Sequence, residues 1–249
     1  MLKPREFVDR YQVEKVVCCF SGGRDSLVST HFMLEDLNGL PVEKYVVWVD
    51  TTITLPSVRK FVRETAEELG WPLVELKPDA TFEEYALRFG MPTMFRRWCC
   101  YYLKLRPIFK FIKEISPDGG VVGEVVGIRR DESRRRRNYP QVSRRPHSLL
   151  YCPILDWTQE DVEKYMERNG LPTPPWYGWG IKETCQCGAF ASTRSLKEVC
   201  KRYPSFFRRF LELEKKFRSG GSAFFLDGRP YYAREIWEEV WNGRKRRRG

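Results

Sequence analysis

Long apolar runs, amide side chains and histidine are scarce in this sequence. No stretch approaches the roughly 20 apolar residues that a membrane-spanning helix needs. The first residues also lack the apolar segment of a signal peptide, so we expect a cytoplasmic protein. Asn and Gln number four each, against 44 Lys and Arg, a composition typical of hyperthermophile proteins. The two histidines are too few and too isolated to suggest a zinc–histidine site.

Positive charge, in contrast, is abundant. The formal net charge is +11 and the sequence pI is about 9.3. This balance favours a polyanionic substrate or partner, and nucleotides and nucleic acid both qualify. Hydrophobic residues make up 42% of the 249 residues. The chain is therefore long and apolar enough for one large α/β domain, alone or with a small helical annex.

Short apolar segments alternate with helical patterns between residue 15 and about residue 170. This alternation predicts an α/β fold, a doubly wound parallel sheet with helices on both faces. Two more helices follow, which predicts a nucleotide-binding domain over 1–190 and a helical C-terminal annex over 191–249 that ends in the basic tail Arg244–Arg248. We expect strands at 15–20, 45–49, 73–76, 121–128 and 149–154, and helices at 27–37, 56–69, 81–89, 101–115, 158–169, 195–217 and 231–242.

A glycine-rich loop stands between the first predicted strand and the first predicted helix. The backbone N–H groups at the start of a helix lack partners, and the helix dipole is positive there, so an anion binds at this position. Glycines let the backbone come close to a ligand, hydroxyl groups add donors, and arginine adds a planar charge suited to phosphate oxygens. A plain capped glycine turn would explain two glycines, but not the whole hexapeptide, which is Ser21-Gly22-Gly23-Arg24-Asp25-Ser26.

This hexapeptide resembles the PP-loop of the adenine nucleotide α-hydrolase superfamily, usually written Ser-Gly-Gly-Lys-Asp-Ser, with Arg24 in place of the lysine. Four further segments resemble one branch, the phosphoadenylyl-sulfate (PAPS) reductase family, and they occur in that family's order. They are Val49–Pro56, Trp98–Pro107 with its Trp-Cys-Cys and Leu-Lys pairs, Gly127-Ile128-Arg129-Arg130-Asp131-Glu132-Ser133, and Pro153-Ile154-Leu155-Asp156-Trp157.

The resemblance implies a Rossmann-like sheet with the nucleotide at the carboxyl ends of its strands. Ser21–Ser26 would then hold phosphate or phosphosulfate oxygens, and backbone near Val49 and Asp50 would meet the adenine. Arg129 and Arg130 would pair with the anionic end of the substrate. The remaining nucleotide-binding residues implied by the shared motifs are Lys104 and Gly127.

Some members of this family reduce adenylyl sulfate (APS) or PAPS to sulfite with a C-terminal cysteine, typically in a Glu-Cys-Gly-Leu-His tail, which this sequence lacks. Its final cysteine is Cys200, so no catalytic residue is assigned, and an internal cysteine or a thiol or sulfur-donor protein would have to supply the thiol.

Two alternatives to the sulfonucleotide enzyme stay open. One is an ATP-dependent, pyrophosphate-releasing enzyme that uses Mg²⁺ and thiolates tRNA or otherwise modifies RNA. Eight arginines between Arg129 and Arg145 favour an RNA partner, although a solvated basic face would explain them equally well. The other is a nucleotide sensor without catalytic activity.

Eight cysteines remain to be explained in a protein expected in a reducing compartment, although intracellular disulfides do occur in hyperthermophiles. The pairs Cys99-Cys100 and Cys185-Gln186-Cys187 predict a metal site rather than buried thiols. The resemblance favours a [4Fe–4S] cluster over zinc, because the APS-using branch carries Cys-Cys and a distant Cys-x-x-Cys. The second pair here is one residue shorter, so Cys152 or Cys200 is an alternative fourth ligand. Cys18 and Cys19 fall in a core strand and are expected to be buried and inert.

Overall fold

The computed structural model describes residues 1–181, 183–217, 221–226 and 229–245, with side chains up to Trp241. The chain divides into two compact units. Unit 1 comprises residues 1–49, 58–76 and 107–174, and unit 2 comprises 50–57, 77–106 and the residues from 175 onward. The units do not follow the predicted boundary after residue 190, because two segments from the first half of the chain pack with the C-terminal helices. Whether the annex folds as a domain stays a prediction, and Arg246–Arg248 of the expected tail lie outside the described residues.

Unit 1 is built on a six-stranded sheet in the order β3-β2-β1-β4-β6-β5. All neighbouring strands are parallel except β5, which pairs antiparallel with β6 at the sheet edge. The predicted doubly wound α/β fold is therefore confirmed. The strands are β1 (Lys15–Cys19), β2 (Glu43–Val49), β3 (Leu73–Leu76), β4 (Val122–Val125), β5 (Val142–Arg144) and β6 (Leu149–Tyr151).

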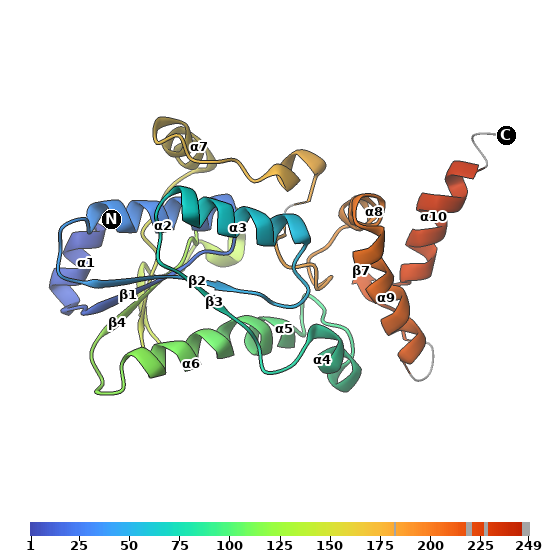
Figure 1. The fold of residues 1–249 in the computed structure, drawn as a ribbon, viewed down its shortest axis with the longest axis horizontal. Coiled ribbons are helices and arrows are strands. Elements are labelled where there is room, and N and C mark those ends of the chain that lie inside the picture. The colour runs from blue at the N-terminus through green and yellow to red at the C-terminus, as the bar shows by residue number, and fades with distance from the viewer. Residues whose placement is uncertain (182, 218–220, 227–228, 246–249) are drawn as a thin grey trace. The chain divides into compact units, whose positions relative to one another are not determined.

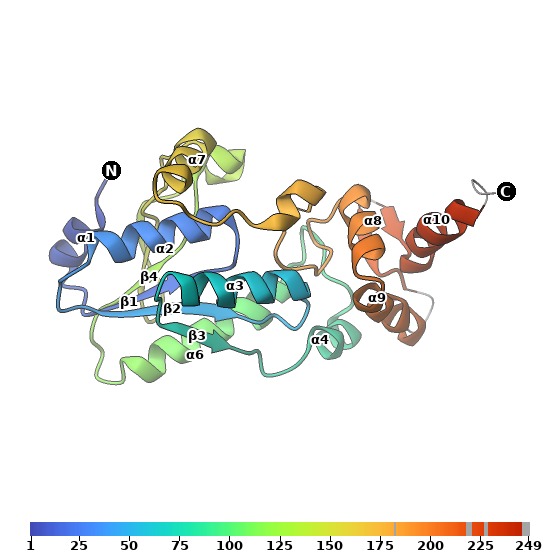
Figure 2. The ribbon, with the colours of Figure 1, turned by 45° about the horizontal axis from the view of Figure 1, so that its top comes forward.

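Helices cover both faces of this sheet, and two views show the same layers. Helices α2 and α3 lie on one face and α6 on the other (Figures 1 and 2). Helix α7 packs on α2 through Tyr165, whose ring meets those of His31 and Phe32. The helices of unit 1 are α1 (Pro4–Tyr11), α2 (Arg24–Asp36), α3 (Pro56–Glu68), α6 (Arg106–Ile115) and α7 (Gln159–Arg168).

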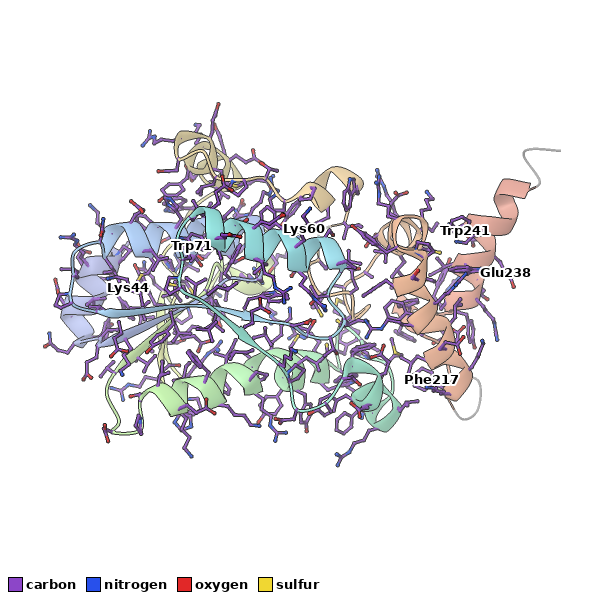
Figure 3. All side chains as sticks on the ribbon, in the orientation of Figure 1. Lys44, Lys60, Trp71, Phe217, Glu238 and Trp241 are labelled. Atoms are coloured by element: carbon purple, nitrogen blue, oxygen red, sulfur yellow. The ribbon has the colours of Figure 1, made fainter. Side chains whose placement is uncertain are left out.

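The core between the sheet and α6 follows directly from strand alternation. Val17, Val47 and Val122 project from three neighbouring strands onto Ile108 and Ile112 of α6, and all five are buried. Alternate residues of a strand point to opposite faces, so a strand buried on both sides must be apolar throughout. This is why the predicted strands appear as continuous apolar runs, and Figure 3 shows side chains filling the layers between the sheet and its helices.

The sheet has its topological switch point at β1, which lies between β2 and β4. The chain leaves β1 toward β2 and β3, then returns to add β4 on the other side. The connections after β1 and β4 therefore start at the same edge of the sheet and run in opposite directions. In doubly wound proteins, ligands bind in the crevice between two such connections. The glycine-rich loop and the residues after β4 are placed at this edge by topology alone.

Several local predictions needed correction. The chain leaves the predicted strand 149–154 at Tyr151 because a turn begins at Cys152, whose backbone carbonyl accepts from Leu155. The predicted strand 121–128 ends at Val125, and its continuation instead makes the close turn described below. The predicted helix 195–217 is two helices that meet at Tyr203, since a residue before proline disfavours helical angles. Helix α1, the edge strand β5 and a C-terminal hairpin were not predicted.

Unit 2 is mainly helical, and a buried carboxylate organises its C-terminal part. The Glu214 side chain accepts hydrogen bonds from the backbone N–H groups of Ala223, Ala233 and Arg234, at 3.2, 2.9 and 3.3 Å. The elements of unit 2 are α4 (Phe82–Phe89), α5 (Trp98–Cys100), the π-helical turn Tyr101–Leu105, a 3-10 turn (Pro175–Trp179), α8 (Thr193–Arg202), α9 (Pro204–Lys216), β7 (Phe224–Leu226), β8 (Arg229–Tyr231) and α10 (Ala233–Lys245).

None of the described helices combines the length and apolar character needed to cross a membrane. The cytoplasmic location itself stays a prediction.

Gly123 provides a test of the packing in unit 1. A Cβ atom on Gly123 would stand 2.8 Å from the Phe7 ring, which is fully buried and stacks on Tyr151 at 4.1 Å. Gly123→Ala should therefore lower the free energy of unfolding by about 1–3 kcal/mol, the usual range for overpacking a core, measured by denaturant titration. Gly178→Ala is the control, because a Cβ there meets no atom within 4 Å. Equal stabilities of the two variants would contradict this packing.

Candidate functional site

The glycine-rich loop leads from β1 into the first turn of α2, and its own hydroxyl groups hold its shape. Ser26 Oγ donates to the Gly23 carbonyl at 2.8 Å and accepts from the Ser21 backbone N–H at 3.1 Å. Gly22 has a φ of 84°, a left-handed conformation that favours glycine. Gly23 is the N-cap of α2 and offers no side-chain acceptor to the first turn. The predicted loop thus has the form of an anion site: a fixed turn in front of an uncapped helix start.

Gly127, in the turn after β4, lies against this first turn of α2. A Cβ atom on Gly127 would stand 2.3 Å from the Asp25 carbonyl oxygen and 2.7 Å from the Ser26 nitrogen. No side chain fits such a gap between two backbones. Glycine at this position is therefore required by close approach, whether or not it touches a nucleotide.

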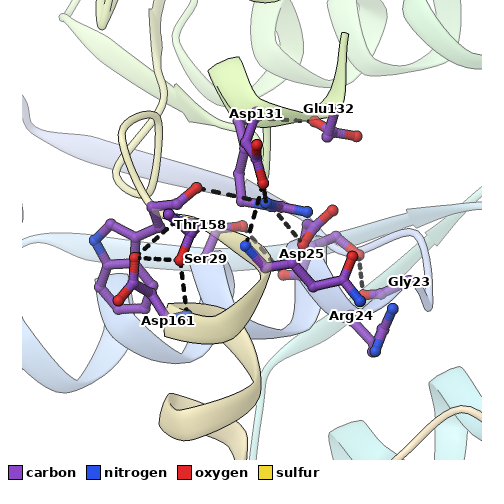
Figure 4. Close-up of polar contacts among 12 residues, drawn as sticks. Gly23, Arg24, Asp25, Ser29, Asp131, Glu132, Thr158 and Asp161 are labelled. Carbon is purple, nitrogen blue, oxygen red and sulfur yellow. Dashed lines mark hydrogen bonds and ion pairs between the residues drawn. The ribbon is translucent and has the colours of Figure 1, made fainter.

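Arg129 is buried, and its guanidinium donates to three acceptors of the protein. Its Nε donates to Asp25 Oδ1 at 2.9 Å, and its Nη1 donates to Asp131 at 3.3 Å and to the Trp157 carbonyl at 3.4 Å (Figure 4). We expected Arg129 to pair with the anionic end of a substrate. In the structure Arg129 also connects the turn after β4 to the start of α2, through its bond with Asp25. A direct contact with substrate stays a prediction.

The other arginines of this segment divide into paired and exposed groups. Arg130 forms an ion pair with Asp156 and donates to the Tyr139 carbonyl, and Arg136 forms an ion pair with Glu132. Arg24 of the loop pairs with Glu163 of α7 at 2.9 Å. Within the described chain, no carboxylate pairs with the exposed side chains of Arg134, Arg135 and Arg137. The basic segment therefore keeps three unneutralised guanidinium groups.

The segment after β2 is held in a fixed conformation by hydrogen bonds of its own side chains. Val49 ends β2 in unit 1, and Asp50 begins a segment of unit 2. Asp50 Oδ1 accepts from the Thr52 backbone N–H at 3.1 Å, and Thr52 has a φ of 61°, which is uncommon for a β-branched residue. Thr52 Oγ1 in turn accepts from the Phe82 N–H at 2.8 Å. The proposed adenine contact of Val49 and Asp50 stays a prediction.

Four cysteines of unit 2, the predicted metal ligands, are linked by contacts between their sulfur atoms. Cys99 and Cys100 end α5, immediately before the π-helical turn, a feature common at functional sites. The Sγ atoms of Cys99 and Cys187 are 3.5 Å apart. Thiol hydrogen bonds also join Cys99 to Cys100 and Cys185 to Cys187. Residues separated by about 85 positions in the chain therefore form one group of sulfur atoms.

These contacts shift the thiol pKa values in opposite directions. The hydrogen bond with Cys100, together with burial, raises the pKa of Cys99 to about 12. The same bond lowers the pKa of Cys100 to about 7, and the nearby charge of Lys104 adds to this effect. Burial lowers the pKa of Lys104, but the four sulfur atoms outweigh it and raise that pKa above its usual value. Lys104 is therefore the cation beside this group, and Cys100 is the member whose thiolate form is favoured, because the pKa values of Cys99, Cys185 and Cys187 are all raised.

Lys104 was predicted at the nucleotide site, and its described electrostatic partners are these cysteines. The sulfur donor set has the chemistry of a [4Fe–4S] or zinc site. Its present geometry does not, since no group of three or more His, Cys, Asp or Glu side chains in the described residues is arranged to hold a metal ion. The metal site therefore stays a prediction.

The other four cysteines are Cys18, Cys19, Cys152 and Cys200. Cys18 and Cys152 are fully buried in unit 1, and burial raises the pKa of both, that of Cys152 to about 12. Cys19 is in the same core strand as Cys18, and its pKa is also raised by burial. Cys200 is fully buried in α8. All eight cysteines are described and none forms a disulfide.

Sequence reasoning missed the residues that support these sites. Thr51 Oγ1 donates to Cys185 Sγ at 3.6 Å, and the Gln186 N–H donates to the Ile53 carbonyl at 2.9 Å. Asp131 and Asp25 share Arg129. Each contact joins distant parts of the sequence, and only the order of the motifs suggested that these segments belong together.

Comparison with known proteins agrees with this architecture. Residues 15–219 match the model of the phosphoadenosine phosphosulfate reductase domain. The chain is 30% identical over 202 residues to an uncharacterized protein of Methanocaldococcus jannaschii, covering 80% of this chain and 47% of that protein. It is 27% identical over 173 residues to the adenosine 5′-phosphosulfate reductase of Staphylococcus haemolyticus, covering 67% of each. The chain thus spans about half the length of the first of these relatives.

Two solved structures share the fold. A PAPS reductase from Candida auris, solved as a phosphate complex, superimposes with a TM-score of 0.54 at 21% identity, covering 77% of this chain and 90% of that one. The FMN adenylyltransferase of Candida glabrata gives a TM-score of 0.51 at 15% identity, covering 74% of this chain and 58% of that one. With its domain match spanning most of the sequence, this chain belongs to the PAPS reductase family of the PP-loop superfamily.

Proposed function

We propose that this protein is an enzyme that binds APS or PAPS at the loop Ser21–Ser26 and acts in sulfonucleotide reduction or sulfur transfer. One observation carries the proposal: an uncapped helix start is held open by a fixed glycine loop at the switch point of the sheet. The family supports a sulfonucleotide as the ligand, since several relatives are named APS or PAPS reductase.

In this reaction a thiolate would attack the sulfur of the sulfonucleotide and form a thiosulfonate. The leaving nucleotide, AMP from APS or adenosine 3′,5′-bisphosphate from PAPS, would take the electrons of the S–O bond. A second thiol would then release sulfite as a disulfide forms. The residues of this chain would bind and orient the nucleotide: amides of the first turn of α2 would meet the anionic oxygens, and Ser21 and Ser26 would fix the loop. The thiols would come from internal cysteines or from a partner protein.

Cys99, Cys100, Cys185 and Cys187 are the residues that would hold a [4Fe–4S] cluster or, alternatively, zinc. The proposal rests on donor chemistry, namely four joined sulfur atoms beside a lysine. A bound metal centre would supply positive charge to these thiolates.

A substrate comparison tests the function. Protein purified without oxygen and incubated with a thiol donor should release AMP or its 3′-phosphate, together with sulfite, from APS or PAPS, detected by chromatography. ATP under the same conditions should remain intact. Pyrophosphate release from ATP with Mg²⁺, and no turnover of either sulfonucleotide, would refute this proposal. Tight binding without turnover would instead indicate a nucleotide sensor.

Gly127→Ala tests the position of the nucleotide site. The added Cβ would collide with backbone of Asp25 and Ser26, so the loop must shift. Affinity for APS or PAPS should fall at least tenfold in isothermal titration calorimetry. Gly178→Ala, where a Cβ meets open space, should bind as the parent does. If Gly127→Ala binds normally while circular dichroism shows an intact fold, the site lies elsewhere.

Metal analysis of cysteine variants tests the cluster. Anaerobically purified parent protein should contain iron, or zinc, and Cys185→Ala or Cys187→Ala should lose most of it, as measured by plasma mass spectrometry and visible absorption. Cys152→Ala and Cys200→Ala are the controls and should keep the metal. Retention of metal in the first pair, or its loss only in the second, would reassign the ligands.

A second candidate function, ATP-dependent RNA modification, is favoured by the three unneutralised side chains of Arg134, Arg135 and Arg137. Guanidinium groups on phosphates make affinity depend steeply on salt. The triple alanine variant should reduce the slope of log Kd against log salt by roughly 2 for labelled tRNA, because each phosphate contact contributes roughly 0.7 to 0.9. Fluorescence anisotropy measures it, with Arg168→Ala as the control on α7. An unchanged slope would mean that these three arginines form a solvated basic face and do not contact RNA phosphates.

A further inference from the structure

A second basic site lies in unit 1 at the edge of the sheet opposite the glycine-rich loop. A cavity of about 280 Å³ is bounded by the end of α6 with the turn that follows it, and by the turn between β5 and β6. Val122 and Leu149, the first residues of two parallel strands, line it. The loop Ser21–Ser26 instead follows the carboxyl end of β1. The two sites therefore occupy opposite ends of the strands.

The polar lining of this cavity has one sign of charge. No lining residue is Asp or Glu, and the polar side chains are Lys113, Ser116, Arg144, Arg145, His147 and Ser148. Lys113 and Arg144 are exposed, and no carboxylate of the described chain pairs with them. Glu14 lies against Gly120 at one margin, so an anion would be attracted toward the β5–β6 turn. The cavity is smaller than a typical drug-sized pocket, which suits a small ion.

The side chain of Arg145 is held in place by Glu124 and Phe109. Its Nη1 donates to Glu124 Oε1 at 2.7 Å, and Glu124 is 1% exposed. Ser148 Oγ donates to the other Glu124 oxygen at 3.1 Å. The Arg145 guanidinium also lies over the Phe109 ring, 5.8 Å from its centroid.

Burying a carboxylate is expensive, and burial raises the pKa of Glu124 despite its partners Arg145 and Ser148. A buried ion pair contributes little net stability compared with apolar residues of similar size. It does orient a guanidinium, whose five N–H donors are more than Glu124 uses. The remaining donors belong to a residue that lines the cavity.

We propose that this cavity is a second anion-binding site, which takes a tetrahedral oxyanion such as a phosphate or sulfate group. Arg145 supplies oriented donors, and Lys113 and Arg144 supply charge. The ion is free phosphate or sulfate, or the terminal group of a small metabolite. The site is separate from the proposed nucleotide site and does not depend on it.

Titration calorimetry with inorganic phosphate and with inorganic sulfate tests the site in the full chain. The Gly127→Ala background is used because it is expected to disable the glycine-rich loop. In that background, phosphate or sulfate should still bind, and adding Lys113→Ala with Arg144→Ala should weaken binding at least tenfold. Arg145 is left intact because its removal would strand the buried Glu124. Lys77→Ala with Arg168→Ala is the charge-matched control, and it should bind normally.

Two outcomes would overturn the proposal: no binding of either ion in the Gly127→Ala background, or unchanged binding after both cavity substitutions in a protein that melts at the same temperature. Tighter binding of one of the two ions would identify the chemical class of the occupant. Failure of the nucleotide site would appear separately, as unchanged APS or PAPS affinity in Gly127→Ala alone.

Discussion

Gly127 and Arg129 hold the turn after β4 against the first turn of α2, and the geometry of the glycine-rich loop depends on this contact. Strands β1 and β4 are parallel neighbours, and the segments that follow them run in different directions. The hydrogen bonds of the sheet therefore do not hold these two segments together. The missing side chain of Gly127 lets the two backbones meet, and the Arg129–Asp25 pair fixes them. A ligand binding there finds its donors already in place, which reduces the entropy lost on binding.

The pairing of Arg129 with carboxylates also reduces the attraction that its charge could exert on an anion. Arg129 is shared between Asp25 and Asp131, so two carboxylates offset its charge. If an anion binds here, the amides and the positive dipole end of α2 would then be the principal attraction. At the proposed site, a phosphate-like group would therefore be recognised by its shape, because backbone amides occupy fixed positions and a flexible cation does not.

The sequence predicts the parallel sheet and the place of the glycine-rich loop between β1 and α2 well, because both depend on local signals. An apolar strand, two glycines and a helix start lie within about 20 residues, and their meaning does not require distant partners. Strand β5 was missed because its three residues, Val142-Ser143-Arg144, are too few to show an alternation of apolar and polar side chains. The contact between Arg129 and Asp25 was missed because the two residues are 104 positions apart. The Cys-x-Cys spacing indicated Cys185 and Cys187, and their role as metal ligands stays a prediction; their contact with Thr51 gave no signal in the sequence.

Glu214 has a consequence for how the C-terminal part of unit 2 comes apart. One carboxylate accepts from three amides, at the approach to the β7–β8 hairpin and at the start of α10. Movement of this carboxylate removes the acceptor of all three amides at once. Hydrogen exchange at Ala223, Ala233 and Arg234 that proceeds through such a movement should therefore share one opening event.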